Sequence, residues 1–222
     1  MKDIDELLKS LSFYNKLNND EIEALKKSLF CRKYDKNQFL RSHGDECLGY
    51  IKVISGSIRV YMLSDEGREI TLFRLFEGDE CILSASCVIE QIDFDIQLTS
   101  EEKTEIFIIN SGIFEKLTEK NIYVKCYMYE SLAGSFSKVM NVMQNILFLG
   151  LDKRLAKYLV SECERTGKNV LKTTHEQVAK ELGSAREVVA RKLKQFSENN
   201  IVEVKRGLIA VNDIKALRDI SD

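Results

Sequence analysis

Apolar and polar positions alternate in short runs over the first half of the chain, and glycines separate these runs. Gly44, Gly56, Gly67 and Gly78 recur at intervals of 11 or 12 residues. The strand-like runs are Leu48–Ile54, Ser57–Leu63, Glu69–Phe76, Phe94–Leu98 and Thr104–Ile109. Short strands at this spacing, joined by turn signals such as Ser64–Gly67, predict an antiparallel β-roll or barrel.

Helical periodicity predicts helices on both sides of the roll. Ile4–Ser10 and Asp20–Leu29 precede it, with Asn19 or Asp20 as N-cap of the second helix, and a longer segment from about Ile113 to Leu149 follows it. Apolar residues in the long segment are spaced alternately by three and four: Tyr129, Leu132, Phe136, Val139, Met143 and Ile146. This spacing is typical of two helices packed along a seam, although one helix could also bury the stripe against its own roll. Additional apolar residues beside the stripe (Met128, Met140, Val142 and Leu147) favour the seam and a homodimer.

The segment Thr174–Phe196 has the pattern of two helices joined by a tight turn. Thr174 with Gln177, and Ser184 with Glu187, have the spacing of capping boxes, and Gly183 stands where the first helix must end in left-handed backbone. The apolar faces are Val178, Ala179 and Leu182 in the first helix, and Val189, Leu193 and Phe196 in the second. The opposite face of the second helix carries Arg186, Glu187, Ala190, Arg191 and Lys194. A helix that is apolar on one side and basic on the other suits a DNA major groove, so we predict a helix-turn-helix.

Two β-branched runs follow at once, Ile201–Lys205 and Leu208–Val211, and Arg206–Gly207 separates them. Runs arranged around such a turn predict a hairpin. A hairpin behind a recognition helix forms a wing, and Arg206 at its tip would reach a DNA phosphate. Any one basic residue here is ordinarily just part of a solvated surface, but the caps, the glycine, the apolar faces and the hairpin agree. The predicted partner is double-stranded DNA.

Composition and charge are consistent with a folded protein of one large or two small domains. The chain has 222 residues, of which 44% are hydrophobic and 31% charged, with a net charge of -2. Residues 151–222 hold 15 Lys and Arg against 11 Asp and Glu, whereas the rest of the chain holds 18 against 24. No apolar run approaches the ~20 residues that span a membrane, and the N-terminus lacks a signal-peptide core. We therefore expect a cytoplasmic protein whose six cysteines are reduced and serve mostly in packing.

The order of these parts resembles the Crp-Fnr superfamily of bacterial transcription regulators over nearly the whole chain. The resemblance is carried by Gly44–Asp45, Ser55–Val60, Gly67–Glu69, Gly78–Asp79 and, above all, Leu182–Arg191. It implies an α+β fold: an effector domain over residues 1–110 with a jelly roll similar to cyclic-nucleotide-binding domains, a long dimerisation helix over 111–149, and a winged helix-turn-helix over 150–222. It also implies RNA polymerase as a partner.

Within Leu182–Arg191, the resemblance implies that Arg186, Glu187 and Arg191 read bases. The chemistry agrees, because Arg presents a fork to guanine and Glu accepts a hydrogen bond from cytosine N4. The predicted capping box gives Glu187 a competing role. The predicted DNA-binding set also includes Lys194, Thr174, Ser184 and Arg206.

The sensing region departs from the cyclic-nucleotide motif of that superfamily. The Gly-Glu and Arg-Ser pairs of the motif fall at Ile82–Leu83 and Phe94–Asp95. Residues 75–102 contain eight Asp and Glu and no Lys or Arg, so a phosphodiester buried there would lack a compensating cation. We expect a hydrophobic or redox effector instead of cyclic AMP. The candidate pocket residues are Ile82, Leu83, Cys81, Cys87, Phe94 and Asp95.

No motif in the sequence specifies a cofactor, a metal site or catalysis. The N-terminal region offers only Cys31 and Cys47 for an iron–sulfur cluster, which normally needs four thiolates. Cys81 and Cys87 are interpreted as buried hydrophobes, with a thiol switch or a soft ligand to haem or metal as the alternative. The two histidines, His43 and His175, match no metal site. We predict an effector-responsive regulator and no enzyme. The alternatives are a haem- or thiol-based gas or redox sensor of the same family, or a ligand-binding module that has lost DNA binding.

Overall fold

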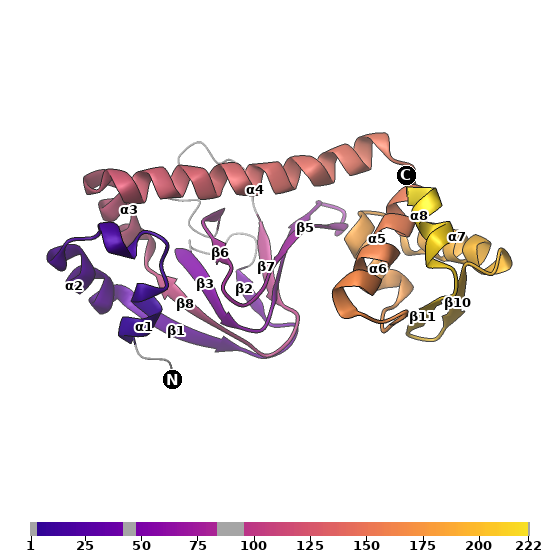
Figure 1. The fold of residues 1–222 in the computed structure, drawn as a ribbon, viewed down its shortest axis with the longest axis horizontal. Helices are drawn as coiled ribbons and strands as arrows, with labels where there is room; N and C mark the ends of the chain where they lie inside the picture. The colour runs from indigo at the N-terminus through magenta and orange to yellow at the C-terminus, as the bar shows by residue number, and fades with distance from the viewer. Residues whose placement is uncertain (1–3, 42–47, 84–95, 222) are drawn as a thin grey trace. The chain divides into compact units, whose positions relative to one another are not determined.

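The computed structural model describes residues 4–41, 48–83 and 96–221. The chain divides into two compact units, whose elements are labelled in Figure 1. The first unit consists of Met1–Met62 and Leu72–Val139, and the second of Leu63–Thr71 and Met140–Asp222. Among the described residues, no helix is both long enough and apolar enough to cross a membrane.

Two helices and a 3-10 turn begin the first unit: α1 (Ile4–Lys9), η1 (Tyr14–Lys16) and α2 (Asn19–Ser28). The N-cap of α2 is Asn18, so the prediction of Asn19 or Asp20 was wrong by a residue or two. Asn18 Oδ1 accepts a hydrogen bond from Glu21 N at 2.9 Å, and Asn18 N donates to Glu21 Oε2 at 2.8 Å. A capping box needs Glu or Gln three residues after the cap, and Asn18 forms both of its hydrogen bonds with Glu21.

The predicted β-roll is made of two four-stranded sheets. The first sheet has the order β1 (Leu29–Tyr34), β8 (Thr104–Ile109), β3 (Tyr50–Ser55) and β6 (Glu80–Cys81). The second has the order β2 (Phe39–Arg41), β7 (Gln97–Ser100), β4 (Ile58–Leu63) and β5 (Glu69–Leu75). The ladders β1–β8, β8–β3, β3–β6, β2–β7 and β7–β4 are antiparallel, which confirms the predicted antiparallel arrangement.

The strands predicted from alternation correspond to β3, β4, β5, β7 and β8. Strands β1, β2 and β6 were not predicted from the sequence. The predicted strand Phe94–Leu98 begins outside the described residues, and the described strand β7 begins at Gln97.

Strand β8 is apolar from Ile106 to Ile109, because both of its faces are buried there. Ile106 and Ile108 face the core between the sheets, together with Val53, Val60 and Leu98. Phe107 and Ile109 belong to a second core, with Leu8 and Leu25 of the N-terminal helices and Phe114 of α3 (Ser111–Lys120). Successive side chains of a strand point to opposite faces, so one strand supplies both cores.

Gly56 shows why glycine is needed between strands of this roll. It lies between β3 and β4 with φ at +85°, a region that residues with a side chain rarely adopt. A Cβ atom there would lie 2.5 Å from the carbonyl oxygen of Lys103. Both the backbone angle and the space exclude a side chain at this turn.

The predicted long helix is interrupted at Asn121, so it forms two helices, α3 and α4 (Ile122–Phe148). Asn121 ends α3 in extended backbone. Its Oδ1 accepts a hydrogen bond from Tyr123 N at 3.0 Å, and its Nδ2 donates to Lys16 O at 2.9 Å and Glu21 Oε2 at 3.0 Å. An Asn side chain that bonds nearby backbone competes with helix continuation, and tertiary partners hold Asn121 in this conformation.

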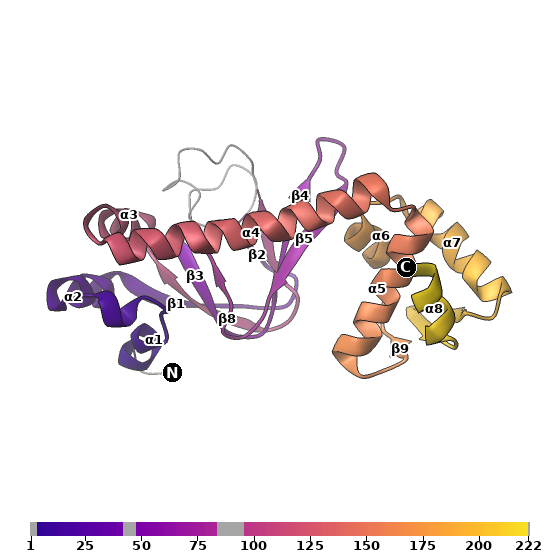
Figure 2. The same cartoon turned by 45° about the horizontal axis from the view of Figure 1, so that its top comes forward.

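The second unit contains α5 (Leu151–Thr166), β9 (Val170–Leu171), α6 (His175–Leu182), α7 (Arg186–Glu198), β10 (Val202–Lys205), β11 (Leu208–Val211) and α8 (Ile214–Ser221). The strands form one sheet in the order β10–β11–β9, and α8 lies against α5 (Figure 2). A separate core holds the unit together, and it includes Leu155, Leu159, Val178, Val189, Leu193 and Leu217.

Candidate nucleic-acid interface

The first helix of the predicted helix-turn-helix, α6, begins with the predicted capping box. Thr174 Oγ1 accepts a hydrogen bond from Gln177 N at 3.2 Å, and Thr174 N donates to Gln177 Oε1 at 2.8 Å. Two backbone donors at the helix start are thereby satisfied. Val178, Ala179 and Leu182 are buried, which confirms the predicted apolar face.

Gly183 ends α6 in left-handed backbone, with φ at +58° and ψ at 41°, as predicted. Ser184 N donates to Ala179 O at 3.0 Å, so the backbone of Ser184 completes the end of α6. The N-cap of α7 is consequently Ala185, which makes no side-chain cap bond. The predicted Ser184–Glu187 capping box was therefore wrong, because the turn after Gly183 takes one residue more than the spacing suggested.

Helix α7 has one buried and one exposed face. Val189, Leu193 and Phe196 are buried in the core of the second unit, as predicted. Glu187, Arg191 and Lys194 are exposed, and their spacing of four and three places them on one stripe of the helix surface. Because Ala185 is the cap, Glu187 lies in the second helical position and its carboxylate has no capping role.

Arg186, the first residue of α7, lies at a hollow beside the predicted wing. The hollow has a volume of about 510 Å³, and its lining includes Thr174, His175, Arg186, Lys205, Arg206 and Gly207. The structure thus brings Arg186, Thr174 and Arg206 of the predicted set to one hollow. His175 and Lys205 were not in that set. His175 begins α6 and Lys205 adjoins the hairpin turn, and these positions were the signals in the sequence that could have placed both residues at the site.

The predicted hairpin is present as β10 and β11. Arg206 and Gly207 form the turn, with φ of Gly207 at +74°, and Arg206 is exposed. A third strand, β9, pairs with β11 through Leu171 and Val170. Strand β9 and helices α5 and α8 were not predicted from the sequence. A two-residue strand and a short terminal helix leave little periodicity to detect.

The basic residues of this surface differ in their pairing. Lys194 Nζ lies 3.8 Å from Glu198 Oε1, and Lys205 Nζ lies 2.8 Å from Glu203 Oε1. Within residues 4–41, 48–83 and 96–221, Arg186, Arg191 and Arg206 form no ion pair, and neither does Glu187. Exposed guanidinium groups without a carboxylate partner are available to bind an external anion.

The predicted effector-pocket residues that the structure describes are core residues. Cys81 and Leu83 are 1% and 2% exposed and belong to the core between the sheets, and Ile82 belongs to the core under the N-terminal helices. Cys87, Phe94 and Asp95 lie outside the described residues.

Two cations near this region of the roll are engaged by carboxylates. Arg74 binds Glu101 through Nε at 2.8 Å and Nη2 at 3.2 Å, and Lys52 binds Glu80 at 2.9 Å. Over the described ranges, no cluster of three or more His, Cys, Asp or Glu could hold a metal ion. Cys163 is buried, and burial raises the pKa of its thiol, with Glu162 and Glu164 adding to the shift.

The residues of the predicted seam lie on two different faces of helix α4. Leu132 and Val139 pack against the cores of the first unit, and Ile146 is half-buried. Tyr129, Phe136 and Met143 are 51%, 63% and 46% exposed. For Leu132 and Val139, the structure therefore favours the alternative that the helix buries them against its own roll.

A different row on α4 is exposed and keeps the spacing of three and four. It consists of Cys126, Tyr129, Ala133, Phe136, Met140, Met143 and Leu147, each of which is exposed in the protomer. The row keeps the alternating spacing of a heptad seam over the length of the helix.

A capped helix pair broken by a left-handed glycine and followed by a hairpin defines a winged helix-turn-helix protein. Residues 153–220 match the family model of the Crp-like helix-turn-helix domain. This chain is similar to a crp/fnr-family protein from Eubacterium rectale whose crystal structure is known. The two sequences are 37% identical and the two structures superpose with a TM-score of 0.92, over 96% of this chain and 99% of that one.

Two curated relatives are more distant. The cAMP-activated global transcriptional regulator Vfr of Pseudomonas aeruginosa is 24% identical over 78% of this chain and 85% of its own length. The cAMP-activated global transcriptional regulator CRP of Haemophilus influenzae is 23% identical over 81% and 82%. With the Eubacterium rectale match, these findings show that the chain belongs to the Crp/Fnr family of transcription regulators. It is a DNA-binding transcription regulator and not an enzyme.

Proposed function

We propose that this protein acts as a homodimer on an inverted-repeat DNA site and responds to an effector other than a cyclic nucleotide. In this proposal residues 1–110 form the effector domain, 111–149 hold the dimerisation helix and 150–222 bind DNA. RNA polymerase is the further partner at a promoter. The observation that carries the proposal is the exposed face of α7, on which Glu187 and Arg191 have no partner among the described residues.

Base reading is assigned to Arg186, Glu187 and Arg191. A guanidinium group can bind guanine O6 and N7 together, and a carboxylate can accept from cytosine N4. The loss of the predicted capping box strengthens the assignment of Glu187, since its carboxylate does not serve the helix start. Lys194, Thr174, Ser184 and Arg206 are assigned to the phosphate backbone, which fixes position but carries no sequence information.

Dimerisation is assigned to the exposed row of α4 and no longer to the full predicted stripe. Tyr129, Phe136 and Met143 stay in the proposed interface, and Met140 and Leu147 join them because they are 38% and 67% exposed. Leu132 and Val139 leave it, because they already pack on the roll. A two-fold dimer would present two α7 helices to half-sites whose centres lie about 34 Å apart.

The proposed effector is hydrophobic or redox-active. Vfr and CRP are described as cAMP-activated, but residues 75–102 of this chain contain no Lys or Arg. Two described cations of the roll, Arg74 and Lys52, are bound by Glu101 and Glu80. A phosphodiester buried beside either of them would have to displace an existing ion pair. Haem stays an alternative that an absorbance spectrum of the purified protein would decide.

Selection from random duplex DNA tests the proposal. We expect the wild-type protein to enrich an inverted repeat. Arg191→Ala and Arg186→Ala should each lose about 1–3 kcal/mol of discrimination at one base pair per half-site. Lys215→Ala, a change of charge in α8, is the matched control and should leave the selected sequence unchanged. If the two arginine variants select the wild-type sequence with uniformly weaker affinity, these residues contact phosphates and the assignment is wrong.

A further inference from the structure

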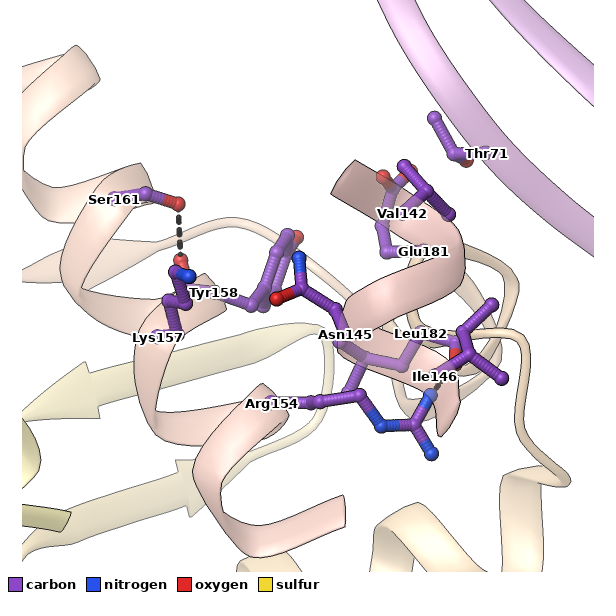
Figure 3. Close-up of a pocket in the computed structure, with 10 residues that line it drawn as sticks. All are labelled: Thr71, Val142, Asn145, Ile146, Arg154, Lys157, Tyr158, Ser161, Glu181 and Leu182. Atoms are coloured by element: carbon purple, nitrogen blue, oxygen red, sulfur yellow. Dashed lines mark hydrogen bonds between the residues drawn. The ribbon is translucent and has the colours of Figure 1, made fainter. Parts of the chain in front are cut away.

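A second hollow lies within the second unit and shares no lining residue with the hollow beside the wing. It has a volume of about 270 Å³, just below the range that is usual for small-molecule sites. Figure 3 shows residues of α4, α5 and α6 around it. Its apolar wall is formed by Val142 and Ile146 of α4 and Leu182 of α6, and polar groups come from Asn145, Arg154 and Lys157.

Arg154 is the most informative residue of this hollow. Its Nη1 donates a hydrogen bond to Leu182 O at 2.5 Å, and in Figure 3 the side chain reaches from α5 to Leu182 and Ile146. Its Nε is buried and has no hydrogen-bond partner in the part of the chain that the structure describes. A buried donor on a charged group without an acceptor is costly and calls for a specific explanation.

Two further donors of the lining are unused. The amide of Asn145 and the ammonium group of Lys157 form no hydrogen bond with any described residue. Burial lowers the pKa of Arg154 from its usual value, but a guanidinium group stays charged in proteins. Arg154 and Lys157 together oppose the single carboxylate of Glu181, so the lining has an excess of one positive charge.

We propose that this hollow binds a small amphipathic monocarboxylate. The carboxylate would accept hydrogen bonds from the unused Asn145 amide and Lys157 ammonium group, beside the positive charge of Arg154. Its apolar chain would lie against Val142, Ile146 and Leu182. A carboxylate supplies one negative charge, which balances the excess positive charge of the lining, and two acceptor oxygens for its unused donors. Leu182 directly precedes Gly183, so the ligand contacts the residue at which the turn between α6 and α7 begins.

The experiment is a titration of the full chain with hexanoate in the absence of DNA, so it does not depend on the proposed DNA-binding function. The Nε–H signal of Arg154 in a ¹⁵N–¹H spectrum is the readout, assigned through its loss in Arg154→Lys. Hexanoate has about eight non-hydrogen atoms, and a ligand of that size reaches a Kd of about 1 mM. We expect the signal to shift and saturate in that range.

Two variants and two probes separate the contributions. Val142→Phe fills the apolar part without changing a polar group, and should weaken hexanoate binding at least about tenfold as measured by calorimetry. Arg154→Gln should do the same, whereas its neighbour Lys153→Gln, outside the lining, should bind like wild type. The alcohol 1-hexanol and inorganic phosphate should each bind at least about tenfold more weakly than hexanoate. The proposal is overturned if hexanoate leaves the Arg154 signal unmoved, if both variants bind it like wild type, or if either probe binds as tightly.

Discussion

The hydroxyl of Tyr127, on α4, donates a hydrogen bond to the carboxylate of Glu80, on β6. The same carboxylate is paired with Lys52 Nζ of β3 at 2.9 Å, and the side chains of Lys52 and Glu80 are each only 13% exposed. Lys52 also donates to Ser10 O, after α1. One buried ionic group thus ties the N-terminal helices, the sheet and α4 together within the first unit. A buried network of this kind stabilises a structure only when its members are all satisfied.

Tyr50 lies beside this network and should make the protein sensitive to alkali. It is fully buried, and its hydroxyl lies 3.4 Å from that of Tyr127. Burial raises the pKa of Tyr50 well above its ordinary value of 10.0, and the Glu80 carboxylate adds to the shift. The folded protein therefore holds this proton more tightly than the unfolded chain. The resulting stabilisation is complete below a pH of about 10 and is lost as pH rises through the folded-state pKa.

We expect the free energy of unfolding to fall as pH rises above about 10, and Tyr50→Phe to reduce the slope of that fall. Urea unfolding between pH about 8 and about 11 measures it. Tyr123→Phe is the control, because Tyr123 is 57% exposed. Equal slopes in wild type and Tyr50→Phe would show that other groups cause the alkaline loss.

If the proposed dimer forms along the exposed row of α4, Phe136→Glu should convert it to monomers. Phe136 is 63% exposed in the protomer, so a single folded chain should tolerate the change within about 0.5 kcal/mol. In a two-fold seam it would bury two facing carboxylates at a cost of about 3 kcal/mol or more. Sedimentation should show monomers for Phe136→Glu and dimers for Ser137→Glu, the exposed neighbour outside the row. A Phe136→Glu protein that dimerises like wild type would place the interface elsewhere.

The two residues predicted as caps should differ in their effect on stability. Thr174 accepts a hydrogen bond from the backbone of Gln177, so Thr174→Ala should lower the free energy of unfolding by about 1 kcal/mol. Ser184 caps no helix, so Ser184→Ala should stay within about 0.5 kcal/mol of wild type. Chemical unfolding of both variants is the measurement. A loss of similar size in the two variants would contradict the structure and indicate that Ser184 also caps a helix.

Arg206→Ala should weaken binding to all DNA sequences about equally. Because the substitution would remove one proposed phosphate interaction from each subunit of the proposed dimer, it should reduce the slope of log K against log salt concentration by about 1 per subunit. Anisotropy titrations at several salt concentrations measure this slope. Arg218→Ala is the control. Arg218 lies in α8 and pairs with Glu164 of α5, so it is already bound within the protein. A change of base preference in Arg206→Ala would mean that the wing reads sequence.

Cyclic AMP and cyclic GMP should show no binding by calorimetry at physiological concentrations. The reason is the absence of any Lys or Arg over residues 75–102, since a buried phosphodiester needs a compensating cation. The CRP of Haemophilus influenzae, described as cAMP-activated, is the positive control. A dissociation constant in the micromolar range for either nucleotide would contradict the prediction.

Local interactions explain why much of the fold and part of the candidate site could be predicted from the sequence. The Thr174–Gln177 box and Gly183 depend on residues at most a few positions apart, and the glycine requirement at the turn is a property of its own backbone. The same holds for Arg206–Gly207, where a two-residue turn sets the register of β10 and β11. Periodicity likewise predicted Val189, Leu193 and Phe196 as the buried face of α7, since one helix has only one side that can face the core.

Tertiary structure decided the features that depend on distant partners. The heptad spacing of α4 is compatible with two adjacent stripes, and only the packing of Leu132 and Val139 on the roll left Phe136 and Met140 outside. Asn121 interrupts the long helix because Lys16 and Glu21, about a hundred residues away, hold its amide. The partnerless Nε of Arg154 exists only because α5 and α6 meet at Leu182. Periodicity reports which residues can be buried together, whereas the choice among equivalent faces is made by the free energy of packing with elements that are remote in sequence.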